Sequence, residues 1–171
     1  MITNLSSELP EVIQKLHDSK YQFVMTGSRV FGGVTLESDY DFFVKHDDSI
    51  DDFLDKLSFY RNHEKEYKDV SIVSIYTREP TFSSNPPIDI QVLSPVMFEA
   101  KIAVQNILFK MYGGVRGGLP GDKQFRRVLW DVALAMYQGG QESITKDSLV
   151  ERSNRLTWIL KAFTPATFPS K

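Results

Sequence analysis

The sequence contains no cysteine, which excludes disulfide bonds and thiolate metal sites. It also lacks an apolar run of membrane-spanning length, and its N-terminus does not join a basic segment to an apolar one as a secretory signal does. Lys and Arg number 20 against 22 Asp and Glu, and a formal net charge of −2 argues against a broad phosphate-binding surface. We therefore expect a soluble cytoplasmic protein with no membrane partner and no strong bulk binding of nucleic acid.

Glycine is confined to three short stretches of the chain. The ten glycines fall within residues 27–33, 113–121 and 139–140, so the segments between them are clearly separated. No Gly-Lys-Ser/Thr follows the first stretch, which excludes a P-loop. With 171 residues, 42% of them hydrophobic, the chain is expected to form one domain, or a core with a small helical appendage.

Hydrophobic spacing and turn residues predict an α/β protein with a short mixed sheet, helices against it and a helical C-terminal segment. Four strands are expected, at residues 21–25, 39–45, 70–77 and 88–93. Helices are expected at residues 7–19, 49–60, 94–112, 122–137 and 145–163, with a brief helical turn at 29–31. Residues 61–68 are interpreted as a charged connection, and Trp130 and Trp158 are expected to pack from their helices.

Two carboxylates, Asp39 and Asp41, lie two positions apart on the second predicted strand. Side chains alternate along a strand, so both point to the same side of the sheet. They follow a Gly27-Ser28 turn, which joins the first strand to a helical turn, where free N–H groups favour a phosphate. Carboxylate oxygens also suit Mg²⁺. The arrangement indicates a divalent metal and a phosphate, although Asp-x-Asp alone also fits an exposed pair on an edge strand.

The stretch from Thr26 to Val44 resembles the signature of the polymerase-β-like nucleotidyltransferase superfamily, in which Gly-Ser is followed, after ten residues, by Asp-x-Asp between apolar residues. It looks closest to the minimal members, including the bacterial antitoxin-type nucleotidyltransferases. The residues that fall in register are Gly27, Ser28, Gly32, Ser38, Asp39 and Asp41. Ile88-Asp89-Ile90 supplies the family's third carboxylate on a later strand. The resemblance covers residues 21–93, and the chain departs from it at Phe31, where an arginine is common.

This resemblance implies a nucleotidyltransferase core at residues 1–94 and a helical segment at 95–171 packed on it. It implies a metal-dependent transfer of NMP from an NTP, ATP among the candidates, to a hydroxyl group with release of pyrophosphate. Asp39, Asp41 and Asp89 would be the catalytic carboxylates and the ligands of Mg²⁺ or Mn²⁺. Asp89 would serve the second metal ion and act as a candidate general base, since two ions about 3.5–4 Å apart can stabilise the attacking and leaving oxygens.

For the nucleotide, the resemblance assigns the β- and γ-phosphates to Gly27 and Ser28. Arg29 is either a further phosphate contact or a charge that caps the turn. The loop 113–121 is either a flexible connection or a lid that carries basic residues to the substrate. The candidate basic residues, from the loop and the helices beside it, are Arg116, Lys123, Lys101, Lys110, Arg126 and Arg127.

Two questions stay open at this level. The hydroxyl acceptor is a protein side chain, an RNA 3′ end or a small molecule, because the acceptor pocket would be built from the unmatched C-terminal part. The alternative to an enzyme is a catalytically inactive nucleotide-binding relative that acts as a regulatory or protein-interaction module. The departure at Phe31 motivates this alternative.

Overall fold

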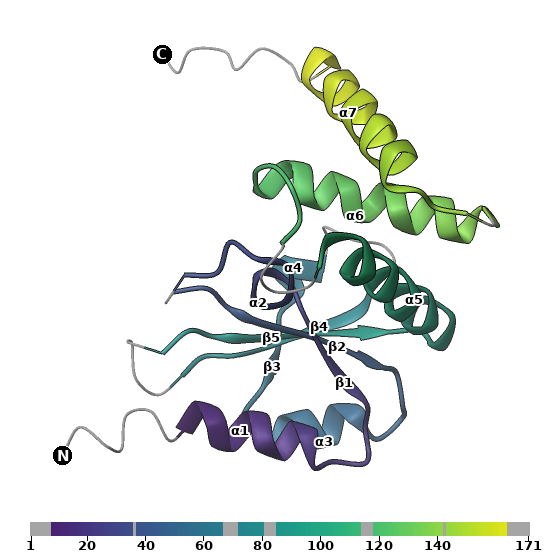
Figure 1. Cartoon of the computed structure of the whole chain (residues 1–171). Coiled ribbons are helices and arrows are strands. Elements are labelled where there is room, and N and C mark those ends of the chain that lie inside the picture. Colours follow the sequence, from purple (N-terminus) through teal and green to yellow (C-terminus); the bar gives the residue numbers. More distant parts are fainter. Residues whose placement is uncertain are drawn as a thin grey trace.

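The computed structural model describes residues 8–35, 37–66, 72–80, 85–113, 118–141 and 143–163 (Figure 1). These residues form a mixed α/β structure with a five-stranded sheet and seven helices. The strands are β1 (Phe23–Thr26), β2 (Tyr40–Lys45), β3 (Tyr60–Arg61), β4 (Ile72–Arg78) and β5 (Ile88–Leu93). The helices are α1 (Glu8–His17), α2 (Ser28–Phe31), α3 (Ile50–Lys56), α4 (His63–Glu66), α5 (Pro95–Tyr112), α6 (Lys123–Gln138) and α7 (Lys146–Phe163).

The sheet has the strand order β1-β2-β5-β4-β3. The pairing of β2 with β5 is parallel, whereas the other three pairings are antiparallel. The last strand in the sequence, β5, therefore lies in the middle of the sheet, between β2 and β4. This order makes residues of β2 and β5, which lie far apart in the sequence, direct neighbours in the sheet.

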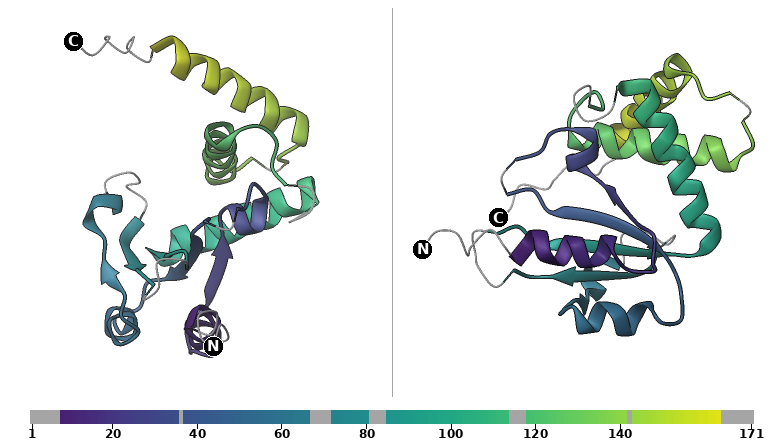
Figure 2. Two further views of the ribbon diagram at one scale, coloured as in Figure 1. Left: turned by 90° about the vertical axis from the view of Figure 1, so that its left-hand side faces the viewer. Right: turned by 60° about the horizontal axis from the view of Figure 1, so that its bottom comes forward.

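Helices cover both faces of the sheet (Figures 1 and 2). One face packs on α1 and α3 around a core that includes Leu16, Phe42, Leu54 and Ile90, all 5% exposed or less. The opposite face packs on α5, where Phe43 meets Phe98 with ring centroids 5.8 Å apart. Because side chains alternate, every second residue of β2 and β5 points to the α5 face, and this is where the aspartates of both strands lie.

The C-terminal helices stack beyond α5 on the same side of the sheet (Figure 1). Ser94 begins α5 by accepting a hydrogen bond from the Met97 N–H at 3.3 Å, and Gly113 ends it in a left-handed conformation. Asp122 caps α6 by accepting from the Phe125 N–H at 2.8 Å. A second core, centred on α6, joins α5, α6 and α7 to α2. Within the described residues, no helix is long and apolar enough to cross a membrane.

The expected strands and long helices are confirmed to within a few residues, with three corrections. The second long helix, α3, ends at Lys56 rather than near residue 60, because Ser58 adopts a left-handed φ of 65° and turns Phe59 into the core. Residues 61–68 are not only a connection, since they supply part of β3 and all of α4. Trp158 does not pack and is 71% exposed, because the end of α7 extends past its partner helix.

Candidate functional site

The Gly27-Ser28 turn joins β1 directly to α2, as the sequence predicts. Gly27 adopts φ 75°, and its carbonyl accepts hydrogen bonds from the N–H groups of Val30 and Phe31, each at 3.0 Å. A Cβ atom on Gly27 would lie 2.4 Å from Asp41 Oδ2, so the backbone here approaches a carboxylate in a way that only glycine permits. The turn and the Asp-x-Asp segment are therefore in direct contact.

The aspartates of two separate segments meet on the α5 face of the sheet. The parallel register of β2 and β5 pairs Asp41 directly with Asp89, and Asp39 comes immediately before β2. Residues directly opposite each other on neighbouring strands point to the same face. The structure thus brings Asp39, Asp41 and Asp89 together, from positions up to 50 residues apart in the sequence.

The same row continues across two further strands. Thr26 of β1 is paired with Asp41, and Thr77 of β4 is paired with Asp89. The order across the sheet is Thr26, Asp41, Asp89 and Thr77, four oxygen-bearing side chains on four adjacent strands. The Thr77 hydroxyl donates to Asp89 Oδ1 at 2.6 Å, and both residues are buried.

Burial and close packing beside other carboxylates raise the pKa values of Asp41 and Asp39. Burial, followed by the charges of Asp89 and Asp39, raises the pKa of Asp41 to about 6. The pKa of Asp39 is raised by burial, by the charge of Asp89 and by a side-chain hydrogen bond with it. Lys65 and Lys123 oppose both shifts through their positive charges. The two lysines therefore supply positive charge to the carboxylate cluster.

Lys65 is a second side chain, after Thr77, that contacts this cluster from outside the predicted site. Its ammonium lies 2.6 Å from Asp89 Oδ2, and it comes from α4, the short helix that the sequence did not predict. Burial lowers the pKa of Lys65, but the hydrogen bond to Asp89 and the charges of all three aspartates outweigh this, so its pKa is raised. Within the described residues, both Asp89 oxygens thus have a protein donor.

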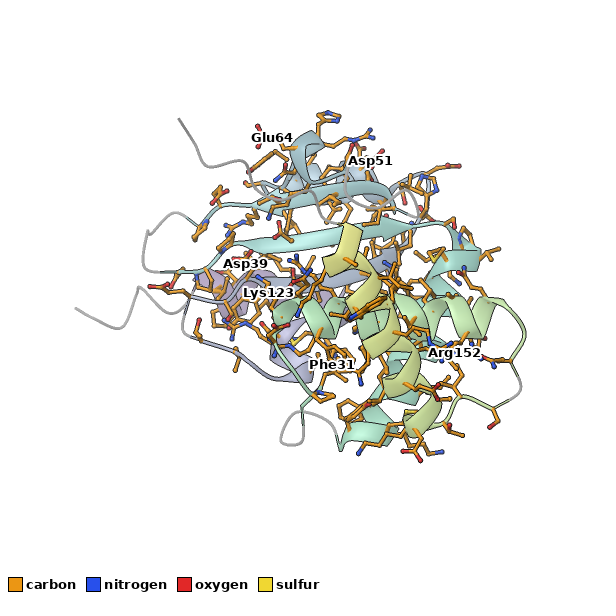
Figure 3. The ribbon with its side chains drawn as sticks, turned by 90° about the horizontal axis from the view of Figure 1, so that it is seen from above. Phe31, Asp39, Asp51, Glu64, Lys123 and Arg152 are labelled. Carbon is orange, nitrogen blue, oxygen red and sulfur yellow. The ribbon has the colours of Figure 1, made fainter. Side chains whose placement is uncertain are left out.

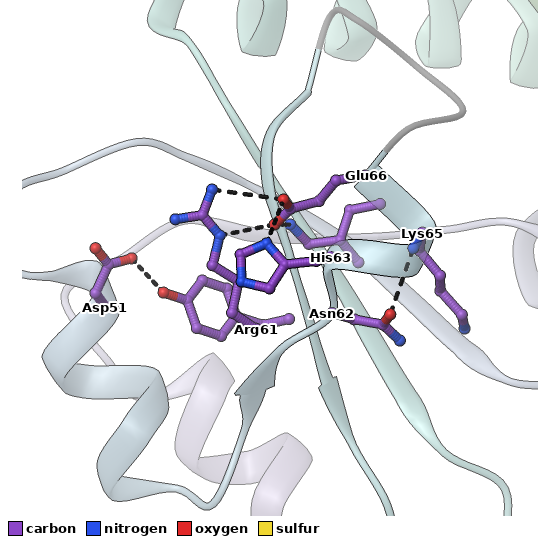
Figure 4. A network of polar contacts seen from close by, with 8 residues as sticks. Asp51, Arg61, Asn62, His63, Lys65 and Glu66 are labelled. Carbon is purple, nitrogen blue, oxygen red and sulfur yellow. Dashed lines mark hydrogen bonds and ion pairs between the residues drawn. The ribbon is translucent and has the colours of Figure 1, made fainter.

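Lys65 is held in place by a network that ties α4 to β4 (Figure 4). The Lys65 N–H donates to Asn62 Oδ1 at 3.3 Å, and Asn62 Nδ2 donates to the Thr77 hydroxyl at 3.0 Å. At the other end of α4, Glu66 accepts from the Ile75 N–H at 3.1 Å and forms an ion pair with Arg61 at 2.8 Å. These contacts fix where α4 stands relative to Asp89.

Lys123 is a second lysine whose charge acts on the cluster. It is the first residue of α6, and its charge acts on both Asp39 and Asp41. Viewed from above, the labelled Lys123 lies beside Asp39 (Figure 3). Of the other basic candidates, Lys101 donates to Gln91 Oε1 at 3.3 Å and Arg126 donates to the Gly121 carbonyl at 2.8 Å. Two further candidates, Lys110 and Arg127, are exposed on their helices.

Arg29 is bound within the turn region itself. Its guanidinium carbon lies 3.7 Å from the centre of the Tyr40 ring, and its Nη2 donates to the Ser38 carbonyl at 2.8 Å. Both contacts hold the start of β2 against α2, which favours the capping interpretation of this residue. A phosphate contact by Arg29 stays a prediction.

Phe31, where the nucleotidyltransferase signature that the sequence resembles often has arginine, is part of the core. It is 5% exposed and packs edge-on against Trp130 of α6, with ring centroids 5.6 Å apart. Its carbonyl accepts from the Leu119 N–H at 2.9 Å, which ties the end of the glycine-rich loop to α2. The departure from the family pattern thus has a packing role. Arg116 lies outside the described residues.

The three aspartates were predicted to bind a divalent metal ion. Within the described part of the chain, no three Asp, Glu, His or Cys side chains are placed so that they could hold a metal ion together. The donors of the cluster are nevertheless all oxygen, which suits Mg²⁺ or Mn²⁺. Mg²⁺ is commonly bound by one or two carboxylates together with substrate phosphates. Binding of such an ion by Asp39, Asp41 and Asp89 stays a prediction.

The sequence interpretation missed Thr77 and Lys65. Thr77 had a usable signal, because a hairpin centred near residue 83 would pair it with Asp89. Lys65 had none, since its neighbours in the sequence are those of a solvated, charged connection.

A comparison of the chain with protein families, with characterised proteins and with solved structures finds no significant match in any of the three.

Proposed function

We propose that this protein is a metal-dependent nucleotidyltransferase that transfers NMP from an NTP to a hydroxyl acceptor. The observation that carries the proposal is the register that pairs Asp41 with Asp89, beside Asp39 and against Gly27. In the resemblance to the polymerase-β-like superfamily, these residues form the reaction centre. The five-stranded mixed sheet with helices on both faces is compatible with such a fold.

In the proposed reaction, the acceptor oxygen forms a bond to the α-phosphorus, and the bond from that phosphorus to the pyrophosphate oxygen breaks. Asp39 and Asp41 would hold Mg²⁺ or Mn²⁺, which when bound neutralises charge on the phosphates. The backbone at Gly27 and Ser28 would receive the β- and γ-phosphates, and the proton of the acceptor hydroxyl would pass to Asp89.

Lys123 would complete the phosphate site from the helical segment. Its charge reaches Asp39 and Asp41, so a polyphosphate held by a cation on those residues would lie within its field. Lys123 would thus supply a positive charge near the phosphates, which the chain lacks at Phe31, where the family pattern has arginine.

The direct test uses radiolabelled ATP, CTP, GTP and UTP with Mg²⁺, offered with separated protein, RNA and small-molecule fractions as acceptors. Label should move to one fraction, and Asp39→Asn and Asp41→Asn should each reduce the rate by at least about 100-fold, since a metal site supplies several kcal/mol of transition-state stabilisation. Label transfer that persists in both variants would refute the proposal.

The alternative is a nucleotide-binding relative without catalysis, and two observations favour it. No three side chains of the described part are arranged as a ready metal site, and Asp89 is already paired with Lys65. Thermal unfolding separates the possibilities further. Both the enzyme and the inactive relative should show Mg²⁺-dependent stabilisation by an NTP, and only the enzyme should transfer label. A pure interaction module should show neither effect.

A further inference from the structure

The Lys65–Asp89 contact is unusual for a surface lysine because its partner is a buried member of the acidic cluster. The Lys65 side chain is 40% exposed and that of Asp89 is 10% exposed. Asp89 also receives the buried Thr77 hydroxyl on its other oxygen. Asp89 is thus supplied with donors by the chain, whereas Asp41 lies against the turn at Gly27.

The position of Lys65 is set by the fold and not only by attraction to a carboxylate. Asn62 contacts both the Lys65 N–H and the Thr77 hydroxyl, so one residue links the base of the lysine to the strand beside Asp89. Glu66 fastens the far end of α4 to the backbone of β4. The ammonium is therefore pre-positioned at the Asp89 end of the row, where its charge acts on all three aspartates.

We propose that the Lys65 ammonium takes the place of a second metal ion beside Asp89, so that the site uses one divalent cation, held by Asp39 and Asp41. This inference rests on the proposed function. An ammonium carries three N–H donors, and the described contact with Asp89 uses one of them. The others are available for the acceptor oxygen or an α-phosphate oxygen, the groups that a second ion would polarise. A divalent ion beside Asp89 would be repelled by the ammonium already there.

The test counts metal ions rather than turnovers. Mn²⁺ bound to the full chain is measured by electron paramagnetic resonance in the presence of the α,β-methylene analogues of ATP, CTP, GTP and UTP, each in turn. The wild type should bind one Mn²⁺ per chain with the preferred analogue. Lys65→Met should bind two, with the spectral broadening that a close pair of Mn²⁺ ions produces, and Lys65→Arg should return to one.

Lys45→Met is the matched control. The Lys45 side chain is 43% exposed, and it pairs with Glu99 at 2.9 Å, away from Asp89, so its loss should leave one Mn²⁺ bound.

Two ions on the wild type, or an unchanged count in a folded Lys65→Met variant, would overturn the inference while leaving the proposed function standing. If the wild type binds no Mn²⁺–nucleotide complex, or Asp41→Asn binds it equally well, the proposed function itself fails. Circular dichroism establishes folding, and Lys65→Gln, which also removes the positive charge, replaces Lys65→Met in the count if that variant does not fold.

Discussion

The carboxylate of Asp41 should destabilise the metal-free protein at neutral pH. Burial, and then the charges of Asp89 and Asp39, raise its pKa to about 6 from an ordinary value of 3.8. The folded state therefore binds the proton more tightly than the unfolded state does. The stabilising effect of this proton is complete below pH 4, declines as pH rises, and is lost above pH 6. A difference of roughly two pKa units corresponds to about 3 kcal/mol.

Asp41→Asn keeps the size of the side chain and removes its charge, so it isolates this effect. In EDTA at pH 8, the variant should be more stable than the wild type by about 3 kcal/mol, which raises the melting temperature by roughly 6–12 °C for a chain of this length. Near pH 4 the two proteins should have nearly equal stability. Urea unfolding followed by circular dichroism from pH 4 to pH 8 measures the difference directly.

The control for this experiment is Asp48→Asn, the same chemical change at an exposed position after β2. It should alter stability by less than about 0.5 kcal/mol at every pH. A gain from Asp41→Asn that is absent at pH 8, or that stays constant between pH 4 and pH 8, would refute the electrostatic reasoning. With Mg²⁺ and the preferred NTP the order should reverse, because only the wild type gains the energy of binding.

Three further substitutions test other parts of the site. Phe31→Ala should cost about 3–5 kcal/mol in urea unfolding, because it empties a core position that is 5% exposed; a loss below 1 kcal/mol would mean that this part of α2 is not packed as described. Gly27→Ala should lower the melting temperature and abolish Mg²⁺–NTP stabilisation, since its Cβ would lie 2.4 Å from Asp41 Oδ2; a normal ligand response would contradict the close approach. Thr77→Val should cost about 1–3 kcal/mol by removing a buried donor to Asp89, and Thr77→Ser should restore most of it; equal losses in the two variants would indicate packing rather than the hydroxyl.

The parts of the fold that local patterns determine could be predicted. Alternation of apolar and polar residues along 39–45 and 88–93 predicts two strands that carry Asp41 and Asp89, with the apolar residues pointing to the other face. The structure agrees. Ser94 followed by proline is a strong helix start, and α5 begins there. These features depend on residues within one or two turns of each other, so the sequence alone carries them.

The remaining features depend on contacts between distant residues. The two residues of β3 are exposed and have no periodicity, and they form a strand only because they pair with Thr77 and Tyr76 of β4. The short helix α4 is secured by Glu66 reaching the Ile75 N–H, a partner nine positions away. The position of Lys65 depends on both β3 and α4. For that reason its place beside the aspartates could not be inferred from its sequence neighbours.

The sheet order has a consequence for how the chain is made. Of the five described strands, β5 leaves the ribosome last, and it fills the gap between β2 and β4. Until Ile88–Leu93 have been synthesised, both neighbours carry an open hydrogen-bonding edge of the kind that pairs readily with other chains. A nascent chain that stalls before that point holds Asp39 and Asp41 without Asp89, and exposes two aggregation-prone edges. The acidic cluster is thus completed in the same event that closes the sheet.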